Sequence, residues 1–331
     1  MLSISVLGAG SWGTALALLL ARNGHAVTLW AHNPHHLEQL RVDRCNRRYL
    51  PDARFPPNLA VTADLAVTLR NPLLLIAVPS HAFSGLLRSL APNLPANTGI
   101  AWATKGLEAD TGRLLHIVAE EILGSSVPTA VLSGPTFAGE VAADLPTAIT
   151  VASHAPDFAG TWVKLLHNAR FRAYSSEDMI GVQLGGATKN VLAIAAGVSD
   201  GLGFGANARA ALITRGLAEM MRLGLALGGK AETLMGLAGV GDLLLTCTDD
   251  QSRNRRFGLG LGRGETQEQV RRQIGQEIEG IATAGILYRS AQVHGIDLPI
   301  TEQVYRILFE QLHPREAVQN LLIREPKSES A

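Results

Sequence analysis

Lys189 is the residue whose sequence surroundings most clearly call for a chemical explanation. It lies within residues 179–198, a stretch long and apolar enough to form a buried helix. Burying the charge of a lysine is costly unless the ammonium group is paired or used. The alternative is a surface position, because a lysine in an apolar segment can reach solvent along its flexible stem. We expect Lys189 to be buried, to transfer protons, and to have Asn190 as a polar partner.

A second lysine and a carboxylate occur where chain segments change character. Lys105 follows the predicted strand 99–103, and strand carboxyl ends face the ligand cleft in open α/β sheets. Asp242 follows the glycine-rich segment 236–241 and begins a short apolar helix, so it can act in the site, as a helix N-cap, or as both. Desolvation and a second cation lower a lysine pKa, whereas a carboxylate raises it. The sequence leaves open which effect dominates at Lys189.

Residues 251–256 form a compact run of hydrogen-bond donors. The run reads Gln-Ser-Arg-Asn-Arg-Arg and offers hydroxyl, amide and guanidinium groups. Such donors suit a phosphate, because charge-assisted bonds to guanidinium are short and strong. The alternative is a basic loop that is merely solvated. The net charge of the chain is zero, and with a dinucleotide motif in the same chain we favour the anion site.

The dinucleotide motif is a glycine turn close to the N-terminus. Gly8-Ala9-Gly10-Ser11-Trp12-Gly13 has the pattern G-x-G-x-x-G and connects a predicted strand to an apolar helix. Gly8 permits the tight turn, Gly10 lets the backbone approach a pyrophosphate, and Gly13 lets the helix pack closely on the strand. The helix N-terminus adds free N–H groups and a positive dipole end. The alternative is a core of the same type that binds another nucleotide or none.

The end of the second predicted strand bears on cofactor choice. A carboxylate there normally binds the adenosine ribose and selects NAD, but the sequence reads Trp30-Ala31-His32-Asn33. The missing acid leaves room for a 2′-phosphate, so we expect NADPH to be accepted. His32 can contact the ribose or phosphate, and a solvated loop histidine is the alternative.

The pattern of elements predicts the fold that positions these residues. Apolar runs at 3–7, 27–31, 73–78, 99–103, 129–132, 148–152 and 171–174 predict strands, and helical segments lie between several of them. Residues 35–57 are polar and contain proline, and we expect irregular chain there. Beyond Asp178 strand signals nearly vanish. The prediction is a Rossmann-type, mostly parallel sheet with helices on both faces over 1–178, an all-α domain over 179–323, and a disordered polar tail over 324–331.

Bulk properties exclude several classes of function. The chain has 331 residues, 47% of them hydrophobic, which suits two globular cores. Its net charge of zero gives no indication of a nucleic-acid partner, and no apolar run approaches the ~20 residues that span a bilayer. Two cysteines without metal-ligand or redox spacing predict a reduced cytoplasmic setting and no metal site.

Several motifs, taken together in order, resemble the bacterial NAD(P)-dependent glycerol-3-phosphate dehydrogenase family. They are GAGSWGTA, VPSHAF, ATKGLE, LSGPTFAGEV, GGATKNVLAIAAG, GLAGVGDLLLTC and SRNRRFG, and the likeness extends from Ile4 to about Leu322. The resemblance implies reversible interconversion of dihydroxyacetone phosphate and sn-glycerol 3-phosphate with NADP(H) or NAD(H), which supplies glycerol phosphate for phospholipid synthesis. It also implies a Rossmann domain followed by a helical domain, and a homodimer. Trp12 stands where the family often has another aromatic residue.

The resemblance also implies roles for matching positions. Lys189 corresponds to the general acid/base, with Lys105 and Asp242 beside it in the catalytic group. The implied substrate contacts are Lys105, Gly134, Thr136, Lys189, Asp242, Ser252, Arg253 and Asn254. The implied cofactor contacts, besides the glycine turn, are Ser11, Trp12, His32, Lys105, Ala138, Arg253, and the pair Glu277 and Glu279 of the EIEG segment.

Two other hypotheses remain at this point. A reductase of the same build acting on a different 2-hydroxy or 2-keto compound would share the sheet and the glycines, and only the donor run at 251–256 argues for a phosphorylated substrate. A non-catalytic dinucleotide sensor would keep the glycine turn but has no need of Lys105, Lys189 and Asp242 together.

Overall fold

The computed structural model describes residues 2–325, so the predicted tail lies mostly outside the described residues. One large sheet organises the N-terminal part, with the strand order β10-β9-β8-β7-β6-β1-β2-β5. Its strands are β1 (Ser3–Leu7), β2 (Ala26–Trp30), β5 (Leu59–Thr62), β6 (Leu73–Ile76), β7 (Gly99–Trp102), β8 (Thr129–Ser133), β9 (Thr147–Ala152) and β10 (Phe171–Ser176).

The sheet is parallel except at one junction. Strands β1 and β6 pair in parallel with Ile4 opposite Leu73, and within this sheet, as far as the structure describes it, β8 and β9 are the one antiparallel pair. The central strand β6 is buried along its whole length, as a parallel strand covered on both faces requires. The order reverses between β1 and β6, which is the place where open α/β sheets bind ligands.

Helices cover both faces of this sheet. On one face, α1 packs against α6 and α7, and its apolar side chains join those of β1 in a single core cluster. On the other face, α4 and α5 cover Trp102 and Ile76. These helices are α1 (Ser11–Arg22), α4 (Ser80–Leu90), α5 (Leu115–Leu123), α6 (Ala138–Ala142) and α7 (Pro156–Leu166), and η1 (Ala91–Asn93) and α3 (Leu65–Thr68) are short turns.

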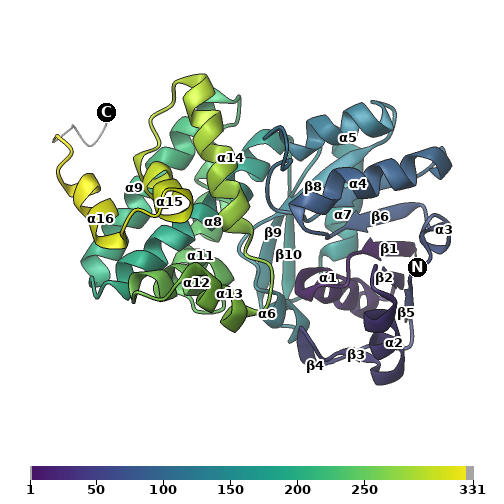
Figure 1. Ribbon diagram of the computed structural model, residues 1–331. Helices are drawn as coiled ribbons and strands as arrows, with labels where there is room; N and C mark the ends of the chain where they lie inside the picture. Colours follow the sequence, from purple (N-terminus) through teal and green to yellow (C-terminus); the bar gives the residue numbers. More distant parts are fainter. Residues whose placement is uncertain (1, 326–331) are drawn as a thin grey trace.

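Helix α8 (Met179–Gly201) is the axis of the C-terminal part. It is buried on all sides over most of its length, because other helices surround it, and such a helix is apolar all round. Figure 1 shows these helices in green and yellow beside the sheet, with β9 and β10 at the junction. They are α9 (Ala206–Ala226), α10 (Ala231–Leu234), η2 (Leu237–Gly241), α11 (Asp242–Thr248), α12 (Arg253–Gly262), α13 (Gln267–Ile274), α14 (Glu279–His294), α15 (Pro299–Phe309) and α16 (Pro314–Leu322).

The predicted fold class is confirmed, but the edge strand β5 is not among the predicted strands, and a second region also differs from the prediction. Residues 35–57 are not irregular: they contain most of α2 (Pro34–Asp43) and the hairpin strands β3 (Cys45–Asn46) and β4 (Leu50–Arg54). The helical period of α2 is faint because only Leu37 and Leu40 are buried. Within residues 2–325, no helix is long and apolar enough to cross a membrane.

Candidate active site

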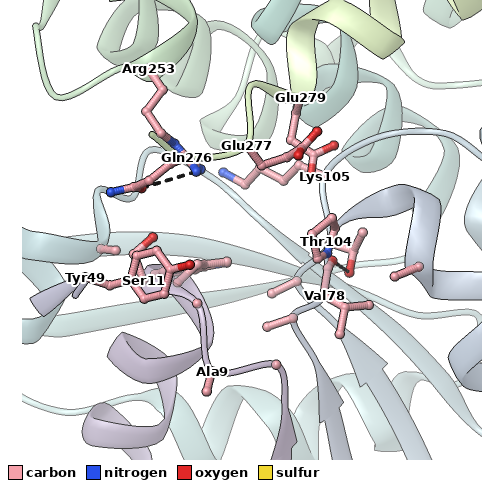
Figure 2. Close-up of a pocket in the computed structure, with 18 of the residues that line it drawn as sticks. Ala9, Ser11, Tyr49, Val78, Thr104, Lys105, Arg253, Gln276, Glu277 and Glu279 are labelled. Atoms are coloured by element: carbon pink, nitrogen blue, oxygen red, sulfur yellow. Dashed lines mark hydrogen bonds between the residues drawn. The ribbon is translucent and has the colours of Figure 1, made fainter. Parts of the chain in front are cut away.

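A cavity of about 1180 Å³ lies where the sheet meets the C-terminal helices. The glycine turn, the carboxyl ends of β2, β6 and β7, and the first residues of α12 and α14 line it. Figure 2 shows Arg253, Glu277, Glu279 and Lys105 facing Ala9, Ser11 and Val78 across this space. The cavity therefore brings together residues of both halves of the chain at the position where the strand order reverses.

The glycine turn is tightly packed on one side and open on the other. Gly8 has φ +119°, and a Cβ there would lie 2.7 Å from the Ala77 carbonyl oxygen. A Cβ at Gly13 would lie 1.8 Å from the Gly8 carbonyl oxygen, so this glycine allows α1 to pack against the turn. Gly10 lines the cavity, and a Cβ there would meet no protein atom within 4 Å. A side chain at Gly10 would thus fill space in the cavity, as expected of a backbone that approaches a pyrophosphate.

Asp242 holds both lysines through its two carboxylate oxygens. Lys189 Nζ donates to Asp242 Oδ1 at 2.5 Å, and Lys105 Nζ donates to Oδ2 at 2.6 Å. Lys105 also donates to the Gly134 carbonyl oxygen at 2.9 Å. The Asp242 side chain is fully buried. The three residues therefore form one compact charged cluster at the cavity wall.

Burial determines the protonation of Lys189. Desolvation is the largest effect, and with the charge of Lys105 it outweighs the opposing effect of Asp242, which lowers the pKa of Lys189 to about 8. The balance that the sequence left open is thus resolved in favour of desolvation. A lysine with such a pKa can lose and regain a proton near neutral pH.

The structure does not realise the N-cap alternative for Asp242 or the expected pairing of Asn190 with Lys189. Asp242 is not an N-cap, because Gly241 occupies that position and the Asp242 side chain makes no capping bond. Asn190 does not pair with Lys189; its Oδ1 accepts from Asn254 Nδ2 at 2.9 Å. The further partner of Lys189 is Thr246, whose Oγ1 accepts at 2.9 Å. Thr246 lies one helical turn after Asp242, and this i, i+4 spacing was a signal that the sequence reasoning missed.

The donor run at 251–256 begins a helix and is not a loop. Ser252 is the N-cap of α12 and accepts from the Arg255 backbone N–H at 3.1 Å. Ser252, Arg253, Asn254 and Arg256 line the cavity. Arg255 points elsewhere, because its guanidinium pairs with Asp200 at 2.6 Å and with Asp250. Most of the run therefore faces the cavity, whereas Arg255 holds α12 in place through its ion pairs.

The remaining predicted residues lie around the same cavity, with three exceptions. Ser11, Trp12, His32, Thr136, Ala138, Glu277 and Glu279 line it. Gly13, Gly134 and Asp242 lie behind its surface. Glu279 Oε2 accepts from Ser80 Oγ at 3.0 Å, and burial raises the pKa of its carboxyl group. The sequence reasoning missed Arg48, Tyr49 and Gln276, which line the cavity from a hairpin and from a loop.

Comparison with known proteins identifies relatives over almost the whole chain. Residues 3–159 and 178–319 match the family models described as the N-terminus and C-terminus of NAD-dependent glycerol-3-phosphate dehydrogenase. The chain is 62% identical over 328 residues to glycerol-3-phosphate dehydrogenase [NAD(P)+] of Methylococcus capsulatus, covering 98% of each chain. It is 57% identical over 329 residues to the protein of the same name from Yersinia pestis, covering 99% of this chain and 97% of that one. The crystal structure of a glycerol-3-phosphate dehydrogenase from Coxiella burnetii superposes with a TM-score of 0.95 at 53% identity, covering 98% of this chain and 99% of that one.

Proposed function

The chain belongs to the NAD-dependent glycerol-3-phosphate dehydrogenase family, and we propose that it interconverts dihydroxyacetone phosphate and sn-glycerol 3-phosphate with NADPH or NADH. The observation that carries this proposal is the Lys189–Asp242–Lys105 cluster, which lies at the wall of the same cavity as the glycine turn. The product supplies the glycerol phosphate of phospholipids.

The part of the cavity wall that the sheet domain forms suits a dinucleotide. The open face of Gly10, the N-terminus of α1, and Ser11, Trp12, His32 and Ala138 are the groups that would hold it, with Glu277 and Glu279 opposite. When bound, the cofactor supplies the hydride for reduction of the substrate carbonyl carbon. The side chains of the chain then have two tasks, which are to hold the substrate and to manage the proton.

Residues in the first turn of α12 bind the phosphate group of the substrate. Ser252, Arg253 and Asn254 line the cavity, and guanidinium–phosphate bonds are charge-assisted. Desolvation lowers the pKa of Arg253, but an arginine remains charged, so it keeps its attraction for a phosphate. Lys105, Gly134 and Thr136 complete the proposed substrate site at the end of β7 and β8.

Lys189 handles the proton. The substrate oxygen gains a proton on reduction, and the Lys189 ammonium group supplies it; in oxidation the neutral amine removes it. Asp242 orients the Nζ atom and limits the lowering of its pKa. Lys105, held by the other oxygen of Asp242, adds a positive charge that favours the neutral form of Lys189 and attracts the anionic substrate.

Domain division, assembly and location complete the proposal. Residues 1–178 form the cofactor domain and 179–323 the catalytic domain; in support, no strand follows Ser176 in the described chain up to residue 325. The protein is a cytoplasmic homodimer, and sedimentation equilibrium should give twice the 35.1 kDa of one chain. The stacked pair Tyr288 and Tyr305 beside half-exposed Phe309 supports an apolar contact surface on α14 and α15.

The test is a spectrophotometric assay of NADPH oxidation by the purified protein. Dihydroxyacetone phosphate should cause a rapid loss of NADPH absorbance, and dihydroxyacetone without its phosphate should be a poor substrate. Equal rates with both ketones would remove the phosphate site from the proposal. Tight NADPH binding without turnover of dihydroxyacetone phosphate would favour a sensor or a reductase for another substrate.

A further inference from the structure

One end of the cavity is positively charged and has no assigned ligand group apart from His32. Ala31, His32 and Asn33 line it after β2, and Arg48 and Tyr49 line it from the hairpin, whose Tyr49 ring contacts His36 of the helix that follows β2. Among residues 2–325, the acids lining the cavity are Glu277, just before α14, and Glu279, its first residue. This end therefore carries the Arg48 cation without a lining carboxylate beside it.

The hairpin that carries Arg48 is fastened to the glycine turn. Asn46, at the end of β3, is completely buried and its Nδ2 donates to the Ala9 carbonyl oxygen at 3.0 Å and to Thr14 Oγ1 at 2.8 Å. His36 of α2 bonds the same carbonyl oxygen through Nε2 at 3.2 Å. These bonds fix the position of the hairpin turn, residues 47–49, relative to the cofactor motif.

The Tyr49 ring contacts both His36, which bonds the glycine turn, and Arg48. The Tyr49 ring meets His36 edge-on at 5.8 Å between centroids, and the Arg48 guanidinium carbon lies 5.2 Å from the Tyr49 ring centroid. Arg48 makes no hydrogen bond or ion pair with any described residue. Its neighbour Arg47, in contrast, pairs with Asp43 at 2.8 Å. The Arg48 guanidinium thus keeps its donors free while a ring contact holds it beside the cavity.

We propose that Arg48 binds the 2′-phosphate of NADP(H) and gives this chain its affinity for the phosphorylated cofactor. The proposal rests on the proposed function, because it concerns the cofactor of that reaction. In dinucleotide folds the adenosine ribose lies at the end of the second strand, and an arginine nearby accommodates the 2′-phosphate. Arg48 supplies that arginine from the hairpin, with His32 opposite at the β2 end, and its planar fork suits a phosphate.

The experiment compares Arg48→Gln with the matched control Arg47→Gln in the full-length protein. Calorimetry gives the dissociation constants of 2′,5′-ADP and 5′-AMP, which differ by the 2′-phosphate. Fluorescence titration gives those of NADPH and NADH. We expect Arg48→Gln to weaken 2′,5′-ADP and NADPH at least about tenfold, as loss of a charge-assisted bond predicts, and to change 5′-AMP and NADH less than about twofold. Arg47→Gln should leave all four constants near those of the wild type.

Two results would overturn this inference while leaving the proposed function intact. Equal weakening of all four ligands would mean that Arg48 contacts the shared part of the cofactor, and unchanged binding throughout would mean that it contacts none of it. If the wild type bound neither NADPH nor NADH, the proposed function and this inference would both be overturned. Melting temperatures of both variants, expected to equal that of the wild type, show whether the hairpin is intact.

Discussion

Asp242 holds Lys105 and Lys189 close together in one small site. Its carboxylate is buried, and each oxygen accepts from a different ammonium group, so the two cations are held at either side of one anion. If only one carboxylate oxygen accepted a hydrogen bond, one of the two ammonium groups would lack this partner. Each lysine has a second partner: Lys105 donates to the Gly134 carbonyl oxygen and Lys189 donates to Thr246 Oγ1. Lys189 is buried, and this burial lowers its pKa, so its proton is lost more easily than that of a lysine in water.

The pKa of Lys189 leads to a pH dependence with opposite signs in the two directions. Reduction needs the protonated amine, so its kcat should fall as the pH rises through about 8, and oxidation needs the neutral amine, so its kcat should rise there. Asp242 raises the pKa of Lys189, so Asp242→Asn should move both midpoints to lower pH. Rate profiles of both enzymes across this range test the prediction. A midpoint that moves upward in Asp242→Asn, or is absent in the wild type, would contradict it.

Single residues differed in how far the sequence could predict their positions. Lys189 was recognisable because a charge in an apolar helix has few explanations, and the structure places it in a buried ion pair. The pairing of Asp242 with both lysines was not predictable, because it joins residues 53 and 137 positions apart. Arg48 gave no signal in the sequence, since only the tertiary bonds of Asn46 bring its hairpin to the cavity.

The crossing of α8 and α12 links the proton donor to the substrate donors. Glycines make it close: a Cβ at Gly258 would lie 2.0 Å from the Ile194 carbonyl oxygen, and one at Gly197 would lie 2.0 Å from the Arg255 carbonyl oxygen. Arg255 secures the same crossing through Asp200, which lies near the end of α8. The distance between Lys189 and the first turn of α12 therefore depends on backbone contact between two helices.

Gly258→Ala should weaken both the fold and substrate binding. The added methyl group must push α12 away from α8, and overpacking of this kind costs on the order of 1–3 kcal/mol. The KM for dihydroxyacetone phosphate should rise because Arg253 and Asn254 move with α12. Denaturant unfolding and steady-state kinetics measure the two effects.

Gly160→Ala is the matched control for that variant. Gly160 also lies in a helix, α7, but a Cβ there would meet nothing within 4 Å. Alanine should stabilise this position by about 0.5–1 kcal/mol and leave KM unchanged. Similar behaviour of the two variants would show that helix propensity, and not the close crossing, determines the outcome.

Helices and strands with long apolar runs were predictable from the sequence, and those with few apolar residues were not. The strand before the glycine turn and the helix α8 follow the apolar runs that predicted them. The start of α12 has no apolar period that would predict a helix, because its first residues are polar and face the cavity or Asp200. The side chain of Ser252 as an N-cap was the available signal.

The whole molecule places its site between a sheet and a helical bundle that are joined by side-chain contacts. One such contact is made by Gln183, which precedes the catalytic lysine on α8. The Gln183 side chain of α8 accepts from the His116 backbone N–H at 3.1 Å and its Nε2 bonds His116 Nδ1 of α5 at 2.8 Å. The His154 ring lies 5.9 Å from that of His116. A histidine that accepts at Nδ1 is neutral, so this contact depends on pH.

His116 should make the folded state weaker in mild acid. Burial, and then the charge of His154, lower the pKa of His116, and they outweigh the Gln183 hydrogen bond and the charge of Glu120, which raise it. The folded state therefore binds fewer protons than the unfolded state, and stability is lost as the pH falls below the ordinary histidine pKa of about 6.5. His116→Asn keeps an acceptor for Gln183 without titrating, so its melting temperature should fall less over this range. His294→Asn, on the exposed end of α14, is the control, and parallel curves for all three proteins would refute the prediction.

The most direct test of the account is the turnover of Lys189→Ala measured beside its NADPH dissociation constant. We predict that kcat falls about 10²–10⁴-fold, as loss of general acid catalysis implies, while the dissociation constant stays near that of the wild type because the glycine turn is unchanged. Lys189→Arg should recover little, since a guanidinium does not exchange its proton near neutral pH. Near-normal turnover in Lys189→Ala would contradict the account and make Lys105 the candidate acid. Loss of NADPH binding would contradict it differently, by showing that Lys189 holds the cofactor or the fold.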